Sequence, residues 1–373
     1  MKKVEENLFC LLRLGLKTEP SSNQAFQNIV NLTENQWAQL KTMADKQGVS
    51  VIALDGLNSL CQAYSLDSVI QNCDKVWWKK FILDWSGQMM AVERKNRQQF
   101  AVMNDMAEKW AEAGCRVMIM KGQANGTMYP VPEHRSPGDI DCYLFENYAT
   151  GNNVARKVGA KVDESWYKHS VIRYKGETFE NHQFFVHTRE GKRSKLLEKE
   201  LEDALNVQEK EFPLLNTELS ILMPPVQWNA MFLTYHACAH FISEGLRLKQ
   251  VLDWAMFLKT NQNGIDWQLL NEFCERHHLR RFMDAMTTIV VDYLGIEVAN
   301  PASATTSPYA ERILSSALDD DDYVFGSGEG GWHNRWHLVK NLFRYRWKYA
   351  DIYEESPWKQ LWYYATGFVF KTE

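Results

Sequence analysis

Through the first 113 residues, apolar positions recur at helical spacing and polar positions fill the faces between them. The clearest early example is the leucine run at Leu8, Leu11, Leu12 and Leu16. Thr33 stands three residues before Gln36, a spacing typical of a capping box at a helix N-terminus. A longer stripe from about Trp85 to Ala113 ends beside a glycine, which suits a helix C-terminus. Residues 1–113 are therefore predicted to be an N-terminal helical region that forms one wall of a cleft.

Between residues 114 and 205 the pattern changes to short apolar runs of strand length. Strands are expected over residues 117–120, 139–144, 170–174 and 178–187. The last two are expected to pair as a hairpin. A short helix is expected from Gln123 to Tyr129, because Pro130 and Pro132 follow it. This segment is predicted to form a core of strands and helices, called the α/β core below.

The remainder of the chain returns to helical spacing. Residues 228–240 predict a buried helix, and Leu248 and Val251 lie on the inner face of the next one. Residues 206–298 are expected to form a helical domain that closes the cleft, and 299–373 a linker with an aromatic and basic helical tail. The predicted fold is α+β: a small mixed β-sheet core flanked by N-terminal and C-terminal helical regions.

Composition and charge narrow the class of protein. The 373 residues carry a net charge of −5, which argues against coating nucleic acid through bulk positive charge. The seven cysteines form no Cys-x-x-Cys pair, a distribution typical of reduced thiols in the cytoplasm. The leucine-rich run near the N-terminus is broken by Arg13 and lacks a cleavage site, and no apolar run reaches membrane-spanning length. A cytoplasmic protein with no transmembrane segment is therefore expected.

The candidate chemistry lies at Asp139-Ile140-Asp141, at the start of one predicted strand. Alternate residues of a strand share a face, so Asp139 and Asp141 project together while Ile140 enters the core. Two neighbouring carboxylates repel each other unless a cation lies between them. Mg²⁺, a hard cation that takes oxygen ligands, is the natural partner. These two residues, called the acid pair below, are therefore a candidate metal site; the alternative is two acids at a solvated strand start.

The stretch around the acid pair has a distinctive order of motifs. Lys121-Gly122 is followed by a short helix ending in Tyr129-Pro130, and then by Arg135-Ser-Pro-Gly-Asp-Ile-Asp. It resembles the uncharacterised nucleotidyltransferase family of the DNA polymerase β-like nucleotidyltransferase superfamily. Superfamily members carry a Gly-Ser or Gly-Gly turn after one strand and Asp-x-Asp on the next, and Lys121-Gly122-Gln123 stands at that turn here. The resemblance covers about residues 110–260.

The resemblance implies transfer of a nucleoside monophosphate from an NTP, such as ATP, to a hydroxyl or phosphate acceptor whose identity it leaves open. Asp139 and Asp141 would hold one or two Mg²⁺ ions, and Glu180 is the candidate third catalytic acid. Phosphate charge would be neutralised by basic side chains, and a glycine at the turn would let the triphosphate approach the backbone. The residues expected to bind nucleotide are Lys121, Gly122, Gln123, Arg135, Ser136, His236, Arg247 and Lys249.

The third carboxylate is the open question in the sequence. In the resembling family it lies two residues before a histidine on the neighbouring strand. If His187 is that histidine, the position holds Phe185, which cannot bind a metal. Glu180 is the nearest acid, but counted along a regular strand from His187 it points to the opposite face. A β-bulge would then be needed to bring Glu180 toward the acid pair.

Two other functions stay open. Without a third carboxylate the protein would be a pseudoenzyme that binds nucleotide without turning it over. Alternatively, the tail from Trp332, where aromatic and basic residues such as Trp336 and Arg344 alternate, packs on the body or binds RNA or an anionic membrane surface. The glycine-rich segment 326–331 lacks the Lys-Ser/Thr of a phosphate-binding loop and is expected to be a loop.

A histidine pair offers a further metal hypothesis. His236 and His240 lie one turn apart on one helix face, a spacing that zinc ligands also use. However, Ala237 stands where a zinc hydrolase of the His-Glu-x-x-His type has its glutamate. A hydrogen-bonding or cleft-lining role is therefore favoured for both histidines.

Overall fold

The computed structural model describes residues 3–18, 23–187, 191–207, 212–243, 245–299, 307–319, 344–356 and 358–359. Over these residues the fold is α+β, as predicted, with many helices and one mixed sheet. None of the described helices is both long enough and apolar enough to cross a membrane.

The described strands form one seven-stranded sheet in the order β3-β4-β5-β2-β1-β7-β6. They are β1 (Met118–Met120), β2 (Ile140–Tyr143), β3 (Lys161–Asp163), β4 (His169–Tyr174), β5 (Glu177–His182), β6 (Leu214–Asn216) and β7 (Ile221–Leu222). Pairing is parallel between β2 and β5 and between β1 and β7, and antiparallel elsewhere. The expected hairpin is confirmed as β4–β5. The sheet also takes in β6 and β7, which follow the segment expected to be the α/β core.

Helices both precede and follow the strands along the chain. Those that precede most of the sheet are α1 (Lys3–Gly15), α2 (Asn23–Val30), α3 (Glu34–Lys46), α4 (Ser50–Ala63), α5 (Leu66–Val69), α6 (Lys75–Glu112) and α7 (Gly122–Gly126). The later ones are α8 (Tyr148–Lys157), α9 (Lys192–Val207), α10 (Val226–Ser243), α11 (Leu248–Asn261), α12 (Trp267–Arg276), α13 (Arg280–Leu294) and α14 (Ala310–Leu318). Short 3₁₀ segments include η1 (Pro132–His134) and η2 (Phe145–Asn147). The predicted capping box at Thr33 is confirmed at the start of α3.

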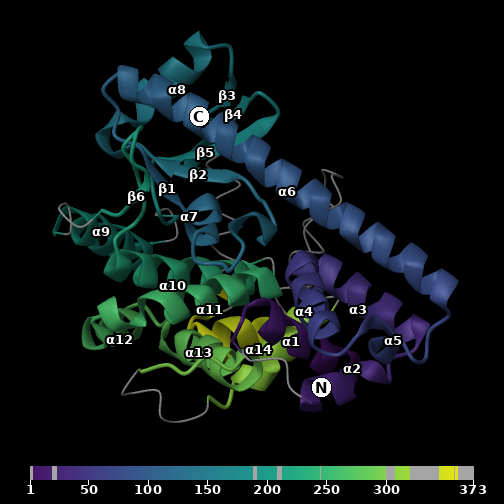
Figure 1. Ribbon diagram of the computed structural model, residues 1–373. Helices are drawn as coiled ribbons and strands as arrows, with labels where there is room; N and C mark the ends of the chain where they lie inside the picture. Colours follow the sequence, from purple (N-terminus) through teal and green to yellow (C-terminus); the bar gives the residue numbers. More distant parts are fainter. Residues whose placement is uncertain are drawn as a thin grey trace.

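The longest element is α6, whose 38 residues extend over about 57 Å at 1.5 Å per residue. It begins ten residues before the expected start at Trp85, because the Asp74 carboxylate caps the backbone N–H groups of Val76 and Trp77. Exposed apolar residues such as Val76 and Leu83 obscure the helical pattern in this first part. Figure 1 shows α6 running from the N-terminal helices to the sheet, so one rigid element joins the two regions.

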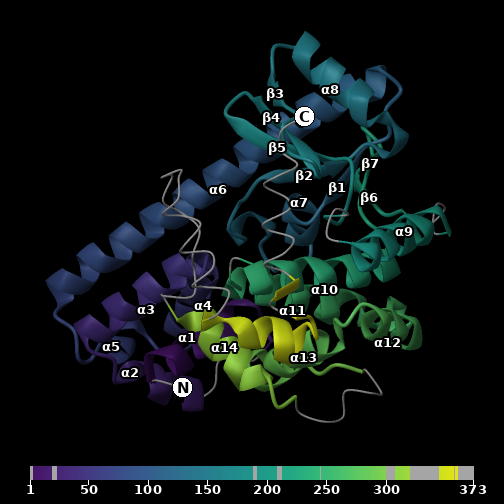
Figure 2. The ribbon, with the colours of Figure 1, turned by 180° about the vertical axis from the view of Figure 1, so that it is seen from behind.

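The two faces of the sheet contact different hydrophobic cores. Ile119, Ile140 and Phe179 belong to a smaller core that they share with Trp110 of α6. The alternate residues Met118 and Met120 belong to a larger core with α10, α11 and the N-terminal helices. Figures 1 and 2 show α10 and α11 between the sheet and helices α12, α13 and α14. The sheet face that carries Met120 therefore looks toward α10 and α11.

The described part of the C-terminal tail packs on the body of the protein. The Trp347 ring lies 5.6 Å from that of Phe241 on α10, and Tyr349 and Ile352 are buried. The Lys348 ammonium lies 4.7 Å from the Phe241 ring centroid. Trp336 and the glycine-rich segment 326–331 lie outside the described residues.

Candidate active site

Three carboxylates share the sheet face that looks toward α10 and α11. Asp141 pairs with Glu180 in the parallel register of β2 and β5, and Asp139 lies two residues before Asp141. Since paired residues of neighbouring strands point the same way, Asp141 and Glu180 project together. Ile140 and Phe179, their neighbours, point into the smaller core on the other face. Strand pairing thus adds a third acid beside the acid pair.

This register corrects the expectations for Phe185 and for a β-bulge. Strand β5 ends at His182, and beyond it the N–H groups of Gln183 and Phe184 donate to the Lys168 carbonyl. The side-chain direction of Glu180 therefore cannot be found by counting alternate residues back from His187, because residues 183–187 are not part of the strand. Glu180 reaches the acid pair on a regular strand, and His182 is the histidine two residues after it.

Phe185 does not occupy the position of the third carboxylate and instead belongs to the hydrophobic core. Its side chain is fully buried in the larger core, with its ring 4.6 Å from that of Tyr143 and 5.0 Å from that of Trp228. Its backbone N–H and that of Val186 donate to the Glu198 carboxylate. Phe185 therefore packs the sheet against α10 and takes no metal-binding position.

The Asp141 carboxylate contacts two basic side chains. The Lys121 ammonium lies 2.5 Å from Asp141 Oδ1, and His182 Nε2 lies 3.0 Å from the same oxygen. Burial would raise the pKa of the Asp141 carboxyl, but Lys121 and His182 hold it well below its usual range. Burial also opposes ionisation of Glu180, yet the adjacent His182 ring lowers its pKa. Both carboxyls are therefore ionised at neutral pH.

Asp139 behaves differently from its neighbours. The residue as a whole is exposed, but its carboxyl is partly desolvated, and this desolvation, followed by the charges of Glu180 and Asp141, raises its pKa. A bound cation would relieve the repulsion among the three acids. The donor set is three carboxylates on one face, which fits a hard divalent cation such as Mg²⁺.

Lys121 adopts a backbone conformation that is rare for a residue with a side chain. Its φ is 50° and its ψ is −133° at the junction between β1 and α7. Such strain costs about 1–3 kcal/mol and persists where the surroundings impose it. The turn brings the ammonium onto Asp141 and places Gly122, where an added Cβ would lie 3.5 Å from the Asp139 carbonyl, at the cavity wall.

The acids lie in a cavity of about 500 Å³ between the sheet, α10, α11 and α13. Its basic lining comprises Lys121, Arg135, Lys168, His169, His236, His240, Arg247 and Lys249. Burial, with Lys121 nearby, lowers the pKa of Lys168 to about 8, and burial, with Arg135 nearby, does the same for Lys249. Two ammonium groups in such a poorly hydrated wall attract an anion strongly.

The far end of the cavity is apolar. It is lined by Leu233, Trp254, Phe282, Met283 and Met286. Of the expected histidines, His236 and His240 both line the cavity, with ring centroids 4.4 Å apart. Burial lowers the pKa of His236 well below its ordinary value, so this ring is neutral at physiological pH. The cavity therefore has its acids on the sheet side, and its helical side combines basic and apolar side chains.

Arg135 reaches the cavity as half of a buried ion pair. Its Nε and Nη2 donate to the two carboxylate oxygens of Asp253, each at 2.8 Å. The Tyr129 hydroxyl donates to the same carboxylate at 2.8 Å. Because Asp253 neutralises the guanidinium, this arginine ties the loop before the acid pair to α11. Lys249 also holds this loop, through a bond of 3.3 Å to the Pro137 carbonyl.

Gln123 and Ser136 are not among the described residues that line the cavity. The Gln123 amide instead donates to Gln99 Oε1 on α6 at 2.6 Å. Gln99 in turn donates to the Gly138 carbonyl at 2.6 Å, immediately before Asp139. Asn96 of α6 donates to the Arg135 carbonyl at 2.9 Å. The structure thus places Gln123 in a network that fixes the loop, away from the expected nucleotide contact.

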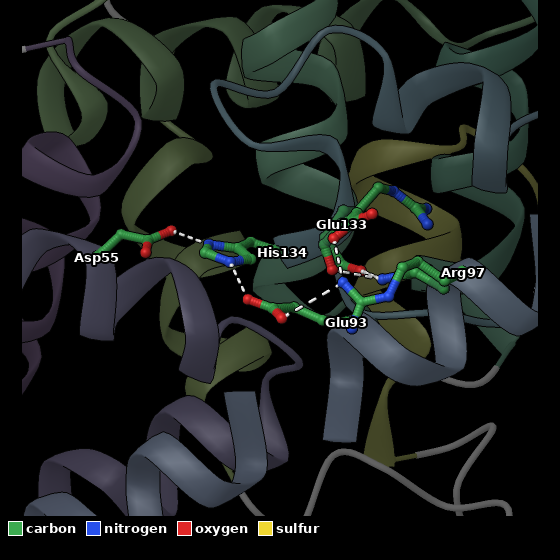
Figure 3. A network of polar contacts seen from close by, with 7 residues as sticks. Asp55, Glu93, Arg97, Glu133 and His134 are labelled. Atoms are coloured by element: carbon green, nitrogen blue, oxygen red, sulfur yellow. Dashed lines mark hydrogen bonds and ion pairs between the residues drawn. The ribbon is translucent and has the colours of Figure 1, made fainter. Parts of the chain in front are cut away.

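A second network holds the same loop to the N-terminal helices (Figure 3). His134 on η1 lies between Asp55 of α4, 2.7 Å from Nδ1, and Glu93 of α6, 3.0 Å from Nε2. Arg97 bridges from Glu93, at 3.5 Å, to Glu133, at 2.7 Å. The hydrogen bonds to Asp55, and then those to Glu93, raise the pKa of His134.

Four further residues of the site were not predicted: Lys168, His169, His182 and Asp253. The sequence carries a signal for His182, which stands two residues after Glu180, and for Asp253, because the resembling family also has an aspartate after Arg-Leu-Lys. Lys168 and His169 carry no signal of their own, because the register between β4 and β5 decides what lies beside them. The partner of Asp253 was not predictable either, since Arg135 lies 118 positions away.

Comparison with known proteins agrees with this geometry. A family model described as "Uncharacterised nucleotidyltransferase" matches residues 33–295, more than half of the chain. The match includes the acid pair, Glu180 and the cavity-lining residues of α10, α11 and α13. No curated protein and no solved structure matches the chain.

Proposed function

The chain belongs to the uncharacterised nucleotidyltransferase family, and on that premise we propose that it transfers a nucleoside monophosphate from a Mg²⁺-bound NTP to a hydroxyl or phosphate acceptor, releasing pyrophosphate. The observation that carries this proposal is the parallel pairing of Asp141 with Glu180, which completes a set of three carboxylates with Asp139. The same arrangement supports assigning the core to the DNA polymerase β-like superfamily.

Asp139, Asp141 and Glu180 are the residues that would hold Mg²⁺. When bound, the ion neutralises phosphate charge and aligns the groups for in-line attack. Glu180 is ionised at neutral pH and is the acid proposed to accept the proton of the acceptor hydroxyl. The pseudoenzyme alternative was motivated by Phe185, and the register of β5 removes that motive.

Basic residues on two sides of the cavity are proposed to hold the triphosphate. Lys121 and Lys168 approach it from the sheet, and Arg247 and Lys249 from α11. Arg135 is assigned a positioning role, because both of its donor edges toward α11 are taken by Asp253. The apolar end between α10 and α13 suits the nucleobase or an apolar part of the acceptor.

The proposal is tested with the full chain, Mg²⁺, each of the four NTPs and a pool of candidate acceptors. Pyrophosphate release reports turnover, and calorimetry reports Mg-NTP binding. Asp139→Asn is expected to abolish both, because it removes one metal ligand from an exposed position that contributes little to packing. Asp203→Asn, an equal charge change on the exposed face of α9, is the matched control. Unchanged Mg-NTP affinity in Asp139→Asn would show that the acid pair does not hold the metal.

A further inference from the structure

Beside the acid pair, two histidines converge on Glu180. His169 and His182 are directly paired across β4 and β5, and they share the site face with Glu180. His169 Nε2 lies 3.5 Å from Glu180 Oε1, and His182 Nε2 lies 3.6 Å from Glu180 Oε2. One ligand atom from each of the three residues lies within 4.8 Å of the others. We propose that His169, Glu180 and His182 bind a first-row transition-metal ion, such as Mn²⁺, Co²⁺ or Zn²⁺, in preference to Mg²⁺.

The spacing of these atoms suits an ion better than direct hydrogen bonds. Nitrogen–oxygen hydrogen bonds span about 2.7–3.2 Å, which is shorter than either contact with Glu180. Two ligands that each lie about 2.1 Å from a tetrahedral ion are about 3.4 Å apart. The observed separations of 3.5 and 3.6 Å match that value. Each carboxylate oxygen of Glu180 thus has one imidazole nitrogen at the distance that separates two ligands of the same metal ion.

The hydrogen bonds of His182 reinforce the inference. Its Nδ1 lies 3.2 Å from the Phe184 carbonyl, which can only accept, so Nδ1 carries a hydrogen. The backbone thus holds Nδ1, and Nε2 is the nitrogen presented to the carboxylate oxygens of Asp141, at 3.0 Å, and Glu180, at 3.6 Å. Metal-binding histidines typically donate their other N–H to a backbone carbonyl in this way.

His169 supplies an independent observation. Its Nδ1 is buried and has no hydrogen-bond partner among the described residues. The ring lies parallel to Trp166, with centroids 6.4 Å apart, and 5.2 Å from the ring of His182. Packing therefore fixes the ring so that Nε2 is the nitrogen presented to Glu180.

The proposed site differs in chemistry from the Mg²⁺ site of the acid pair. Imidazole nitrogen suits transition-metal ions such as Zn²⁺, whereas Mg²⁺ prefers an all-oxygen shell. Glu180 would be shared, so a transition metal would bind next to the acid pair. The inference goes beyond the proposed function and does not depend on it, because the ion would bind without nucleotide.

The test uses the chelator-treated full chain with Mn²⁺, a hundredfold excess of Mg²⁺ and no nucleotide. Electron paramagnetic resonance counts bound Mn²⁺, and its pulsed form detects coupling to imidazole nitrogen. The expected result is one bound Mn²⁺ with nitrogen coupling. His169→Gln should weaken binding about tenfold or more, since loss of even an outer partner of a ligand has that effect. His278→Gln, at an exposed histidine paired with Glu354, is the control and should bind like the wild type.

Other results would overturn the proposal. Mn²⁺ bound without nitrogen coupling would place the ion on carboxylates alone, and displacement by Mg²⁺ would remove the claimed preference. Absence of any bound ion would show that His169, Glu180 and His182 do not form a metal site. The wild-type spectrum distinguishes these outcomes even if His169→Gln fails to fold. Each of them leaves the nucleotidyl-transfer proposal to be decided by Asp139→Asn.

Discussion

At the scale of single residues, Glu180 shows how a side chain's direction depends on where its strand ends. The sequence placed Asp139 and Asp141 together, because their alternation is local, and both line the cavity. It misjudged the direction of Glu180, because counting from His187 crossed the end of β5 at His182. That strand end is fixed by hydrogen bonds to the Lys168 carbonyl, a contact that local alternation does not encode.

We predict that Glu180→Gln separates catalysis from binding. The amide keeps the shape of the side chain but cannot accept a proton, so turnover should fall by about 10²–10⁴-fold. Mg-NTP affinity should fall less than turnover, because the amide oxygen can still bind the ion and the carboxylates of Asp139 and Asp141 remain. Pyrophosphate release and calorimetry provide the two measurements, and Glu146→Gln on exposed η2 is the control. Turnover that survives the substitution would exclude Glu180 as the base.

At the scale of elements, α6 and its partners position the loop that carries the acid pair. Asn96 and Gln99 of α6 bind backbone carbonyls of this loop, and Glu93 binds His134. Most of the long helices follow from the sequence, since their stripes extend over several turns. Strands β6 and β7 were not foreseen, because two or three residues are too few for alternation to be recognised.

The His134 network predicts a stability that depends on pH. Hydrogen bonds to Asp55 and Glu93 raise the folded-state pKa of His134 above its unfolded value of about 6.5. The network's contribution is therefore complete below about pH 6.5 and is lost as the pH rises through the higher folded-state value. His134→Gln should cost about 1.5–3 kcal/mol of unfolding free energy at pH 6, typical of hydrogen bonds to charged groups, and much less at pH 9.

Urea unfolding at the two pH values measures this difference. His278→Gln is the control, because His278 has one carboxylate partner at an exposed site and should show little change at either pH. An equal loss for His134→Gln at pH 6 and pH 9 would mean that the ring contributes by packing and not by its charge.

At the scale of the whole molecule, the cavity lies where the sheet meets the helical layer. Its wall combines β2, β4 and β5 with α10, α11 and α13. The α+β class and the helical regions on either side of the core were predictable, because the spacing of apolar residues changes from helical to strand-like and back along the chain. The meeting of Arg135 with Asp253 was not, because no local pattern specifies which helix covers a sheet face.

A ligand in the cavity that contacts both the sheet and the helical layer should stabilise the folded protein. Mg-NTP at a hundredfold excess over its dissociation constant should add about 2.7 kcal/mol to the unfolding free energy and raise the melting temperature. Differential scanning calorimetry with and without Mg-NTP measures the shift. Asp139→Asn should show no shift, and an equal shift in that variant would place nucleotide binding away from the acid pair.

The packing of α1 also bears on how the protein is made. Arg13 of α1 donates to the carbonyl of Tyr293 in α13, 280 positions later. At about 5–20 residues per second, a ribosome needs about 14–56 s to synthesise that interval. Through this time α1 can pack on α4 but not on α13. The nascent chain therefore presents the apolar surface of α1 that α13 later covers until late in translation.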